Sequence, residues 1–301
     1  MNRKIYWHLP GFCFFRSLNL ITIDLLKEFP EKFREDYQVG SVYGTFPGAI
    51  WNGGRAVFGL VPKHEIENTL KLYNSEEIPV RFTWTNSLLE EKHLQDTYCN
   101  LIMHLADNGV NQVLVNSPIL EEYIRREYPS FPLISSTTKR ITDKAKLRAE
   151  LFKDYYLVVL DYDLNHDQIL LDELKPFADR LEILVNEVCY PNCQKRSEHY
   201  NHQSRMQLEY NVHASFPCPN NSTPRAFAEC MNRPAFISNE RIGDYINRGY
   251  VNFKIAGRGM PMDYVKDSYL YFLVRDEHRD FIRKKIDAIL QQVQQAKRTK
   301  K

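Results

Sequence analysis

The sequence contains no long apolar segment. No run approaches the roughly 18 consecutive apolar residues that a transmembrane helix needs. The first residues also lack the apolar stretch and the small-residue cleavage site of a secretory signal peptide. We therefore expect no membrane association and a cytoplasmic location, where cysteines stay reduced and disulfides are disfavoured.

A surplus of charge of one sign is missing as well. The 301 residues include 40 basic and 38 acidic side chains, which gives a formal net charge of +2. General nucleic-acid binding requires clustered cations that neutralise phosphates, so this balance argues against it. Recognition of one particular RNA or protein partner is left open. Repeats and low-complexity segments are also absent, and a hydrophobic fraction of 43% excludes a disordered chain.

Short apolar segments alternate with helix-like segments along nearly the whole chain. Several are continuously apolar, such as 113–115 and 157–160, a pattern typical of parallel strands that are covered on both faces. The eight predicted strands are 4–8, 40–45, 79–85, 112–116, 132–135, 156–161, 181–186 and 250–255. This order predicts a TIM-like (β/α)8 barrel as a single domain over 1–290, followed by a polar, basic tail over 291–301.

Two further features of the first half are predicted locally. Ser87-Leu88-Leu89-Glu90 has the pattern of a capping box, which predicts a helix that starts there. The segment 43–60 is rich in glycine and aromatic residues and is expected to form an irregular loop.

Polar residues follow nearly every predicted strand, at the barrel end where such folds gather their functional groups. Some, such as Asn86, Ser117 and Asp163, are expected to cap helices. His8 caps nothing, so a pocket role and a packed, hydrogen-bonded histidine explain it equally well. The complete set is His8, Thr45, Thr85, Asn86, Asn116, Ser117, Ser135, Ser136, Asp161, Asp163, Asn186, Glu187, Lys254 and Arg258.

Four of the six cysteines fall in one segment after the seventh predicted strand, 186–232. They are Cys189, Cys193, Cys218 and Cys230. Four thiolates match the ligand count of a [4Fe-4S] cluster or of a structural zinc site, and spacing alone does not choose between them. The nearby His199, His202 and His213 could replace a ligand, although supporting or surface roles are favoured. Cys13 and Cys99 are expected to be ordinary core thiols.

The last predicted strand continues as Lys254-Ile255-Ala256-Gly257-Arg258. It resembles the Lys-Ile-Glu-Gly-Arg segment of the collagenase-like peptidase family U-32, in which this segment also lies downstream of a cysteine-bearing stretch. The strand that runs through a glutamate into cysteines, 181–193, is similar too. The resemblance covers about residues 155–285, and the first half only at the level of fold.

The resemblance implies either peptidase activity or oxygen-independent hydroxylation of RNA bases or quinone precursors. In relatives that act on quinones a four-cysteine [4Fe-4S] cluster is expected. Carried over to this chain, Cys189, Cys193, Cys218 and Cys230 would be the cluster ligands. Lys254 and Arg258 would lie at the barrel mouth. Ala256 replaces the motif's glutamate and the cysteine spacing differs, which implies a divergent branch with another substrate.

Three functions follow as hypotheses. The first is an iron–sulfur enzyme with a redox or hydroxylation activity on an RNA, quinone-like or small-molecule substrate, with Glu187, Lys254, Arg258 and His8 as candidate catalytic residues. The second is a U32-type peptidase. No His-Glu-x-x-His motif is present, which argues against the common kind of metallopeptidase. A cysteine or serine nucleophile would need a partner histidine and an orienting group, for which Glu187 and His199 are the only local candidates. The third is a non-enzymatic barrel with a structural zinc that acts as a binding or scaffold protein.

Overall fold

Eight parallel strands form a closed barrel in the computed structural model, which describes residues 3–218 and 226–298. Each strand pairs with the next along the chain, and β8 pairs with β1. The strands are β1 Ile5–Pro10, β2 Tyr37–Gly44, β3 Val80–Trp84, β4 Gln112–Val115, β5 Leu133–Ser135, β6 Leu157–Val159, β7 Leu181–Leu184 and β8 Asn252–Lys254. The predicted (β/α)8 barrel and all eight predicted strands are confirmed.

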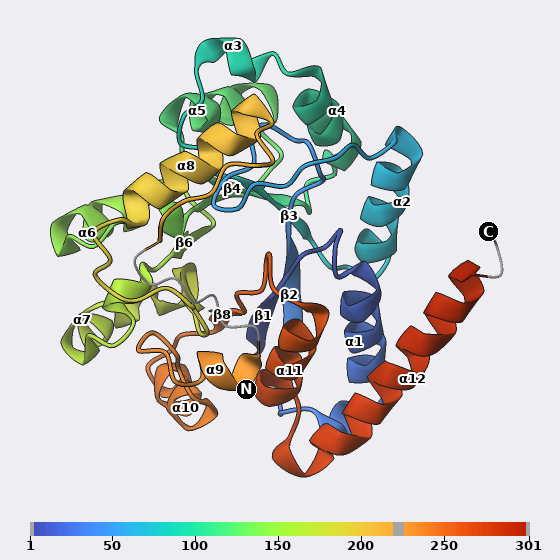
Figure 1. The fold of residues 1–301 in the computed structure, drawn as a ribbon. Coiled ribbons are helices and arrows are strands. Elements are labelled where there is room, and N and C mark those ends of the chain that lie inside the picture. The colour runs from blue at the N-terminus through green and yellow to red at the C-terminus, as the bar shows by residue number, and fades with distance from the viewer. Residues whose placement is uncertain (1–2, 219–225, 299–301) are drawn as a thin grey trace.

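Helices surround the barrel (Figure 1). They are α1 Arg16–Glu28, α2 Lys63–Asn74, α3 Glu91–Leu94, α4 Thr97–Ala106, α5 Pro118–Glu127, α6 Lys144–Leu151, α7 Gln168–Glu173, α8 Arg196–Glu209, α9 Phe227–Cys230, α10 Asn239–Asn247, α11 Met262–Leu273 and α12 Arg279–Arg298. The last helix lies alongside α1 and includes residues 291–298 of the segment predicted to be a tail. Within the described ranges, no helix combines the length and the apolar character needed to cross a bilayer.

The barrel interior is divided into an apolar half and a charged half. Leu114, Ile134, Leu157 and Val159 form a separate apolar cluster contributed by β4, β5 and β6. Strands β1, β3, β7 and β8 instead contribute His8, Arg81, Glu182 and Lys254, all of them buried. The apolar half stabilises the fold because its side chains are removed from water. The charged half can be buried only if its side chains pair with one another.

The predicted helix start at Ser87 is wrong. Ser87 Oγ donates to Asn201 Oδ1 on α8 at 2.7 Å, so its hydroxyl is used in a tertiary contact. The capping box lies three residues later, where Glu90 precedes α3 and the His93 ring accepts from the Glu90 amide at 2.9 Å. A long-range partner for the serine therefore overrides the local pattern.

The segment after β7 is more ordered than the sequence indicated. It contains the 14-residue helix α8, which was not predicted. This helix is polar on nearly all sides, so the periodic apolar pattern on which helix prediction depends is missing. Residues 219–225 of the predicted cysteine-rich segment lie outside the described residues.

Candidate active site at the mouth of the barrel

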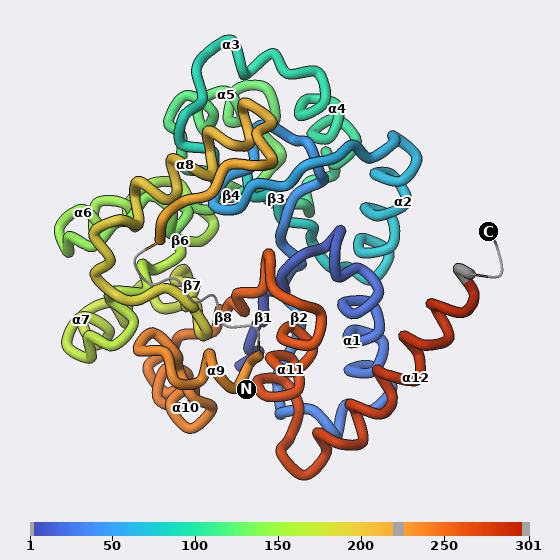
Figure 2. The backbone as a smooth tube through the Cα atoms, in the orientation of Figure 1, coloured from blue at the N-terminus to red at the C-terminus, as the bar shows by residue number. Residues whose placement is uncertain are grey.

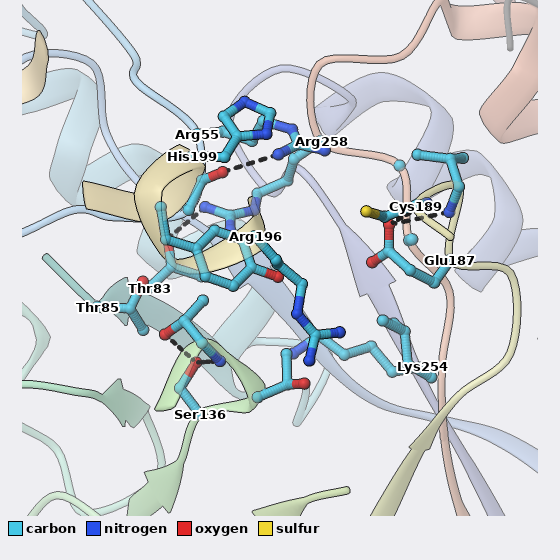
Figure 3. Close-up of a pocket in the computed structure, with 18 of the residues that line it drawn as sticks. Arg55, Thr83, Thr85, Ser136, Glu187, Cys189, Arg196, His199, Lys254 and Arg258 are labelled. Carbon is cyan, nitrogen blue, oxygen red and sulfur yellow. Dashed lines mark hydrogen bonds between the residues drawn. The ribbon is translucent and has the colours of Figure 1, made fainter. Parts of the chain in front are cut away.

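A cavity of about 350 Å³ opens at the C-terminal ends of the strands, where barrels of this class hold their reactive groups. Figure 3 shows its polar residues facing one another across the space. The lining includes Tyr43, Arg55, Thr83, Thr85, Ser136, Thr137, Glu187, Cys189, Arg196, His199, Tyr200, Cys218, Lys254, Ala256 and Arg258. Three of the four predicted catalytic residues, Glu187, Lys254 and Arg258, therefore share one cavity.

Helix α8 is fastened to the loop that follows β2 by side-chain amides. Gln207 accepts from the Val57 amide at 2.7 Å and donates to the Val57 carbonyl at 3.0 Å. Gln203 accepts from the Ala56 amide at 2.9 Å. The tube in Figure 2 shows the two segments running beside each other over the barrel. These contacts explain why a helix without an apolar face is held there.

The first residue of α8 is fixed by a buried ion pair. Arg196 Nη2 donates to both carboxylate oxygens of Asp161, at 2.8 and 2.7 Å, and also reaches Asp163 at 3.2 Å. Its guanidinium lies 4.1 Å from the centre of the Tyr162 ring. Hydrogen bonds between charged groups are stronger than neutral ones, so the positive charge of Arg196 is already compensated within the protein.

Beneath the cavity, the charged half of the barrel centres on Glu182. Its carboxylate accepts a short hydrogen bond from Arg81 and is paired with Lys254 Nζ at 3.1 Å. His8 Nε2 lies 3.4 Å away on the same carboxylate. Glu182 and Arg81 have no exposed side-chain surface, so these ions stabilise one another without water.

The pKa values of these groups follow from burial and neighbouring charge. Burial, opposed by Glu182 and reinforced by Arg81, lowers the pKa of Lys254 to about 8. Burial and the Arg81 charge lower the pKa of His8 to about 3, so this ring is neutral at physiological pH. Burial likewise lowers the pKa of Arg258 to about 10. Two cations whose charged forms are disfavoured thus border the cavity.

Glu187 follows β7 and presents a carboxylate to the cavity. One oxygen, Oε1, accepts from the amides of Val188 and Cys189 at 2.9 and 3.0 Å, which fixes the orientation of the side chain. The other oxygen has no hydrogen-bond partner among the described residues. Glu187 is thus a held carboxylate with one oxygen available to a ligand or a water molecule.

The four predicted ligand cysteines are not gathered into one site. Cys189 and Cys218 line the cavity, but Cys230 is fully buried and donates to the Asn186 carbonyl at 3.4 Å. Burial raises the pKa of the Cys189 and Cys230 thiols to about 11. Over residues 3–218 and 226–298, no three His, Cys, Asp or Glu side chains form a metal-binding group. The cluster and the zinc site therefore stay predictions from the sequence.

The histidines are distributed differently from the cysteines. His8 does not line the mouth cavity: it borders a second cavity of about 840 Å³ at the opposite end of the barrel. Ser41 Oγ lies 2.8 Å from its Nδ1, and Asn252 Oδ1 lies 3.3 Å from its Nε2. His199 does line the mouth, where its ring stacks on Phe216 at 4.7 Å.

Sequence reasoning missed Arg55, Arg81 and Glu182. The sequence contains a signal for two of them: Arg81 and Glu182 are single charged residues inside otherwise uncharged strands. Arg55 lies in the irregular loop after β2, where no local pattern marks it.

A closed parallel barrel with a polar cavity at its C-terminal mouth defines the class of protein: a (β/α)8-barrel protein with a candidate site for a small ligand. No model of a known protein family matches the chain. The chain is 26% identical over 268 residues to the uncharacterized protease MJ1657 of Methanocaldococcus jannaschii, which covers 84% of this chain and 77% of that protein.

A solved structure, that of the U32 peptidase Mk0906, has a similar fold, with a TM-score of 0.53. The two share 14% sequence identity, and the match covers 87% of this chain and 94% of that one. The two findings confirm the resemblance to the U32 peptidases that the sequence indicated.

Proposed function

We propose that the protein is a divergent U32-type peptidase whose active site is the mouth cavity. The observation that carries this proposal is that Glu187 and Lys254, a held carboxylate and a buried cation, line the same cavity. They come from successive strands, β7 and β8, at the barrel end where catalytic groups gather. The similarity to a protein named as a protease supports the same reaction class.

In the proposed reaction, the free oxygen of Glu187 takes a proton from a water molecule. The water oxygen then bonds to the carbonyl carbon of the peptide, and Lys254 stabilises the negative charge that develops on the carbonyl oxygen. The C–N bond breaks, and protonated Glu187 returns its proton to the leaving amine. A nucleophilic Cys189 is disfavoured, because its pKa of about 11 keeps the thiol protonated near neutral pH.

The ionisation of Lys254 suits this role. Although burial lowers its pKa to about 8, the lysine stays mostly charged at neutral pH because Glu182 lies against it. Arg81 in turn compensates Glu182, so the carboxylate beneath the cavity is held in its ionised form. We assign Glu182 and Arg81 to positioning Lys254.

The test is cleavage of a mixed peptide library, followed by mass spectrometry. We expect products from the wild-type protein, and a loss of at least 100-fold in rate for Glu187→Gln, since general-base catalysis typically contributes that much. Glu198→Gln, an exposed carboxylate on α8 paired with Lys195, is the matched control and should keep its activity. Equal rates for Glu187→Gln and wild type would contradict the proposal.

The second candidate is an iron–sulfur enzyme. Its support is that Cys189 and Cys218 line the same cavity as the candidate catalytic residues. Iron, sulfide and zinc analysis of protein purified without oxygen decides it. Four iron atoms per chain would favour the cluster, and zinc alone would favour the scaffold alternative. A protein that contains no metal would favour the peptidase.

A further inference from the structure

The mouth cavity contains more positive than negative charge. Among the described residues, Arg55, Lys254 and Arg258 line it together with one carboxylate, Glu187, and Lys254 is already paired with Glu182 beneath the cavity. Arg196 also borders the cavity, but Asp161 holds its guanidinium with two hydrogen bonds. Figure 3 shows Arg55 and Arg258 together at one side of the space and Lys254 at another side. A cavity lined mainly by charges of one sign attracts ligands of the opposite sign.

Two of these cations lie against the same aromatic ring. Lys254 Nζ is 4.2 Å from the centre of the Tyr43 ring and the Arg258 guanidinium is 6.0 Å from it. Both charges therefore lie near one aromatic ring of the cavity wall. Burial lowers the pKa of both groups, and repulsion from the Arg258 charge lowers that of Lys254 further. A negatively charged ligand would relieve the repulsion.

The hydrogen-bonding capacity of the wall is also incomplete. Thr85 is 3% exposed, and its hydroxyl has no hydrogen-bond partner among the described residues. The buried hydroxyl of Thr137 also has no hydrogen-bond partner among the described residues. Both threonines line the cavity. Unpaired buried hydroxyls are costly, so donors at this position are suited to an acceptor that a ligand supplies.

The Arg55 side chain makes fewer hydrogen bonds to the described residues than that of Arg258 does. Arg258 Nη1 donates to Thr83 Oγ1 at 2.9 Å and to the Gly53 carbonyl at 3.3 Å, so it also holds the loop. For the Arg55 side chain, the only hydrogen bond to the described residues is one to the carbonyl of the preceding residue, Gly54, at 2.9 Å. Its guanidinium therefore has donors left for a ligand.

We propose that the mouth cavity binds an oxyanionic group of the substrate, a carboxylate or a phosphate, through Arg55 and Arg258, with the threonine hydroxyls as additional donors. The proposal rests on the peptidase function for its substrate class: the group is then an acidic side chain or the terminal carboxylate of a peptide. Arginine suits this role because its planar fork matches the geometry of both anions. A cavity of about 350 Å³ has room for one such group beside the reacting amide.

Calorimetric titration of the full chain tests the proposal independently of turnover. The common background is Glu187→Gln, which binds without cleaving if the peptidase proposal holds. The probes are acetyl-Gly-Glu-Gly-amide, its matched Gln peptide, and inorganic phosphate. We expect the Glu peptide to bind at least tenfold more tightly than the Gln peptide, since a hydrogen bond to a charged group typically contributes that much.

Adding Arg55→Met to this background should abolish the preference for the Glu peptide. Adding Arg126→Met instead should keep it, because Arg126 is 62% exposed and is paired with Glu127 on α5, outside the cavity lining. Binding of phosphate without either peptide would support the anion site and contradict the peptidase. Equal affinities for the two peptides, an unchanged preference in Arg55→Met, or no binding by any probe would overturn the anion site.

Discussion

The buried carboxylate of Glu182 permits a quantitative prediction about stability. Glu182 compensates Arg81 and Lys254 inside the barrel, and all three side chains are at most 7% exposed. Glu182→Gln keeps the shape of the side chain and removes its charge. Two buried cations then lose their counter-ion, and breaking a buried pair in this way typically costs about 3–5 kcal/mol. We expect a loss of that size in the free energy of unfolding, a large part of the total for a typical domain.

Urea denaturation followed by circular dichroism measures this change. Glu67→Gln is the matched control, because Glu67 pairs with Lys63 at 3.7 Å on the surface and both are about half exposed or more. An exposed pair of this kind contributes at most about 1 kcal/mol. Adding Arg81→Met to Glu182→Gln should recover part of the loss, because one uncompensated charge is removed. A loss below about 1 kcal/mol for Glu182→Gln would refute the view that these ions depend on one another.

Two further predictions concern Lys254 and Gly40. The pKa of Lys254 is lowered from 10.5 to about 8, so between these pH values the unfolded chain binds more protons than the folded one. Its contribution to the free energy of unfolding should therefore rise by roughly 3 kcal/mol from pH 8 to 10.5, and Lys254→Met should abolish that rise in denaturation curves. A Cβ atom at Gly40 would lie 2.8 Å from the Tyr6 Cβ and 2.9 Å from the His8 ring, so Gly40→Ala should lower the free energy of unfolding in urea by about 1–3 kcal/mol. Gly243→Ala on α10, where a Cβ meets nothing within 4 Å, should have no such cost, and equal losses would contradict the steric explanation.

The strands were predictable because strands buried on both faces consist of consecutive apolar residues. In β4 and β6 every residue is apolar or buried, so the pattern needs no knowledge of the partner strands. Helix α8 is different: its position depends on Gln203 and Gln207 finding backbone groups about 150 residues earlier in the chain. No local pattern can reveal contacts of that separation.

The candidate site was predictable to the extent that its residues lie close to the ends of their strands. Lys254 ends β8, and Glu187 and Arg258 lie in the loops that follow β7 and β8, so all three lie at the mouth. His8 was expected at the end of its strand, but β1 continues for two residues to Pro10. Its side chain consequently belongs to a deeper layer. The pairing of Arg81 with Glu182 across the interior arises only when the barrel closes, since 101 residues separate them.

The most direct test of the peptidase proposal is hydrolysis of a peptide in ¹⁸O-labelled water. If Glu187 activates a water molecule, each new carboxyl terminus formed by the wild-type protein contains one ¹⁸O atom. Mass spectrometry should then find almost no labelled product from Glu187→Gln under the same conditions. Absence of labelled product from the wild type, or equal labelling by the Glu187→Gln variant, would contradict the assignment of the mouth cavity as a peptidase active site.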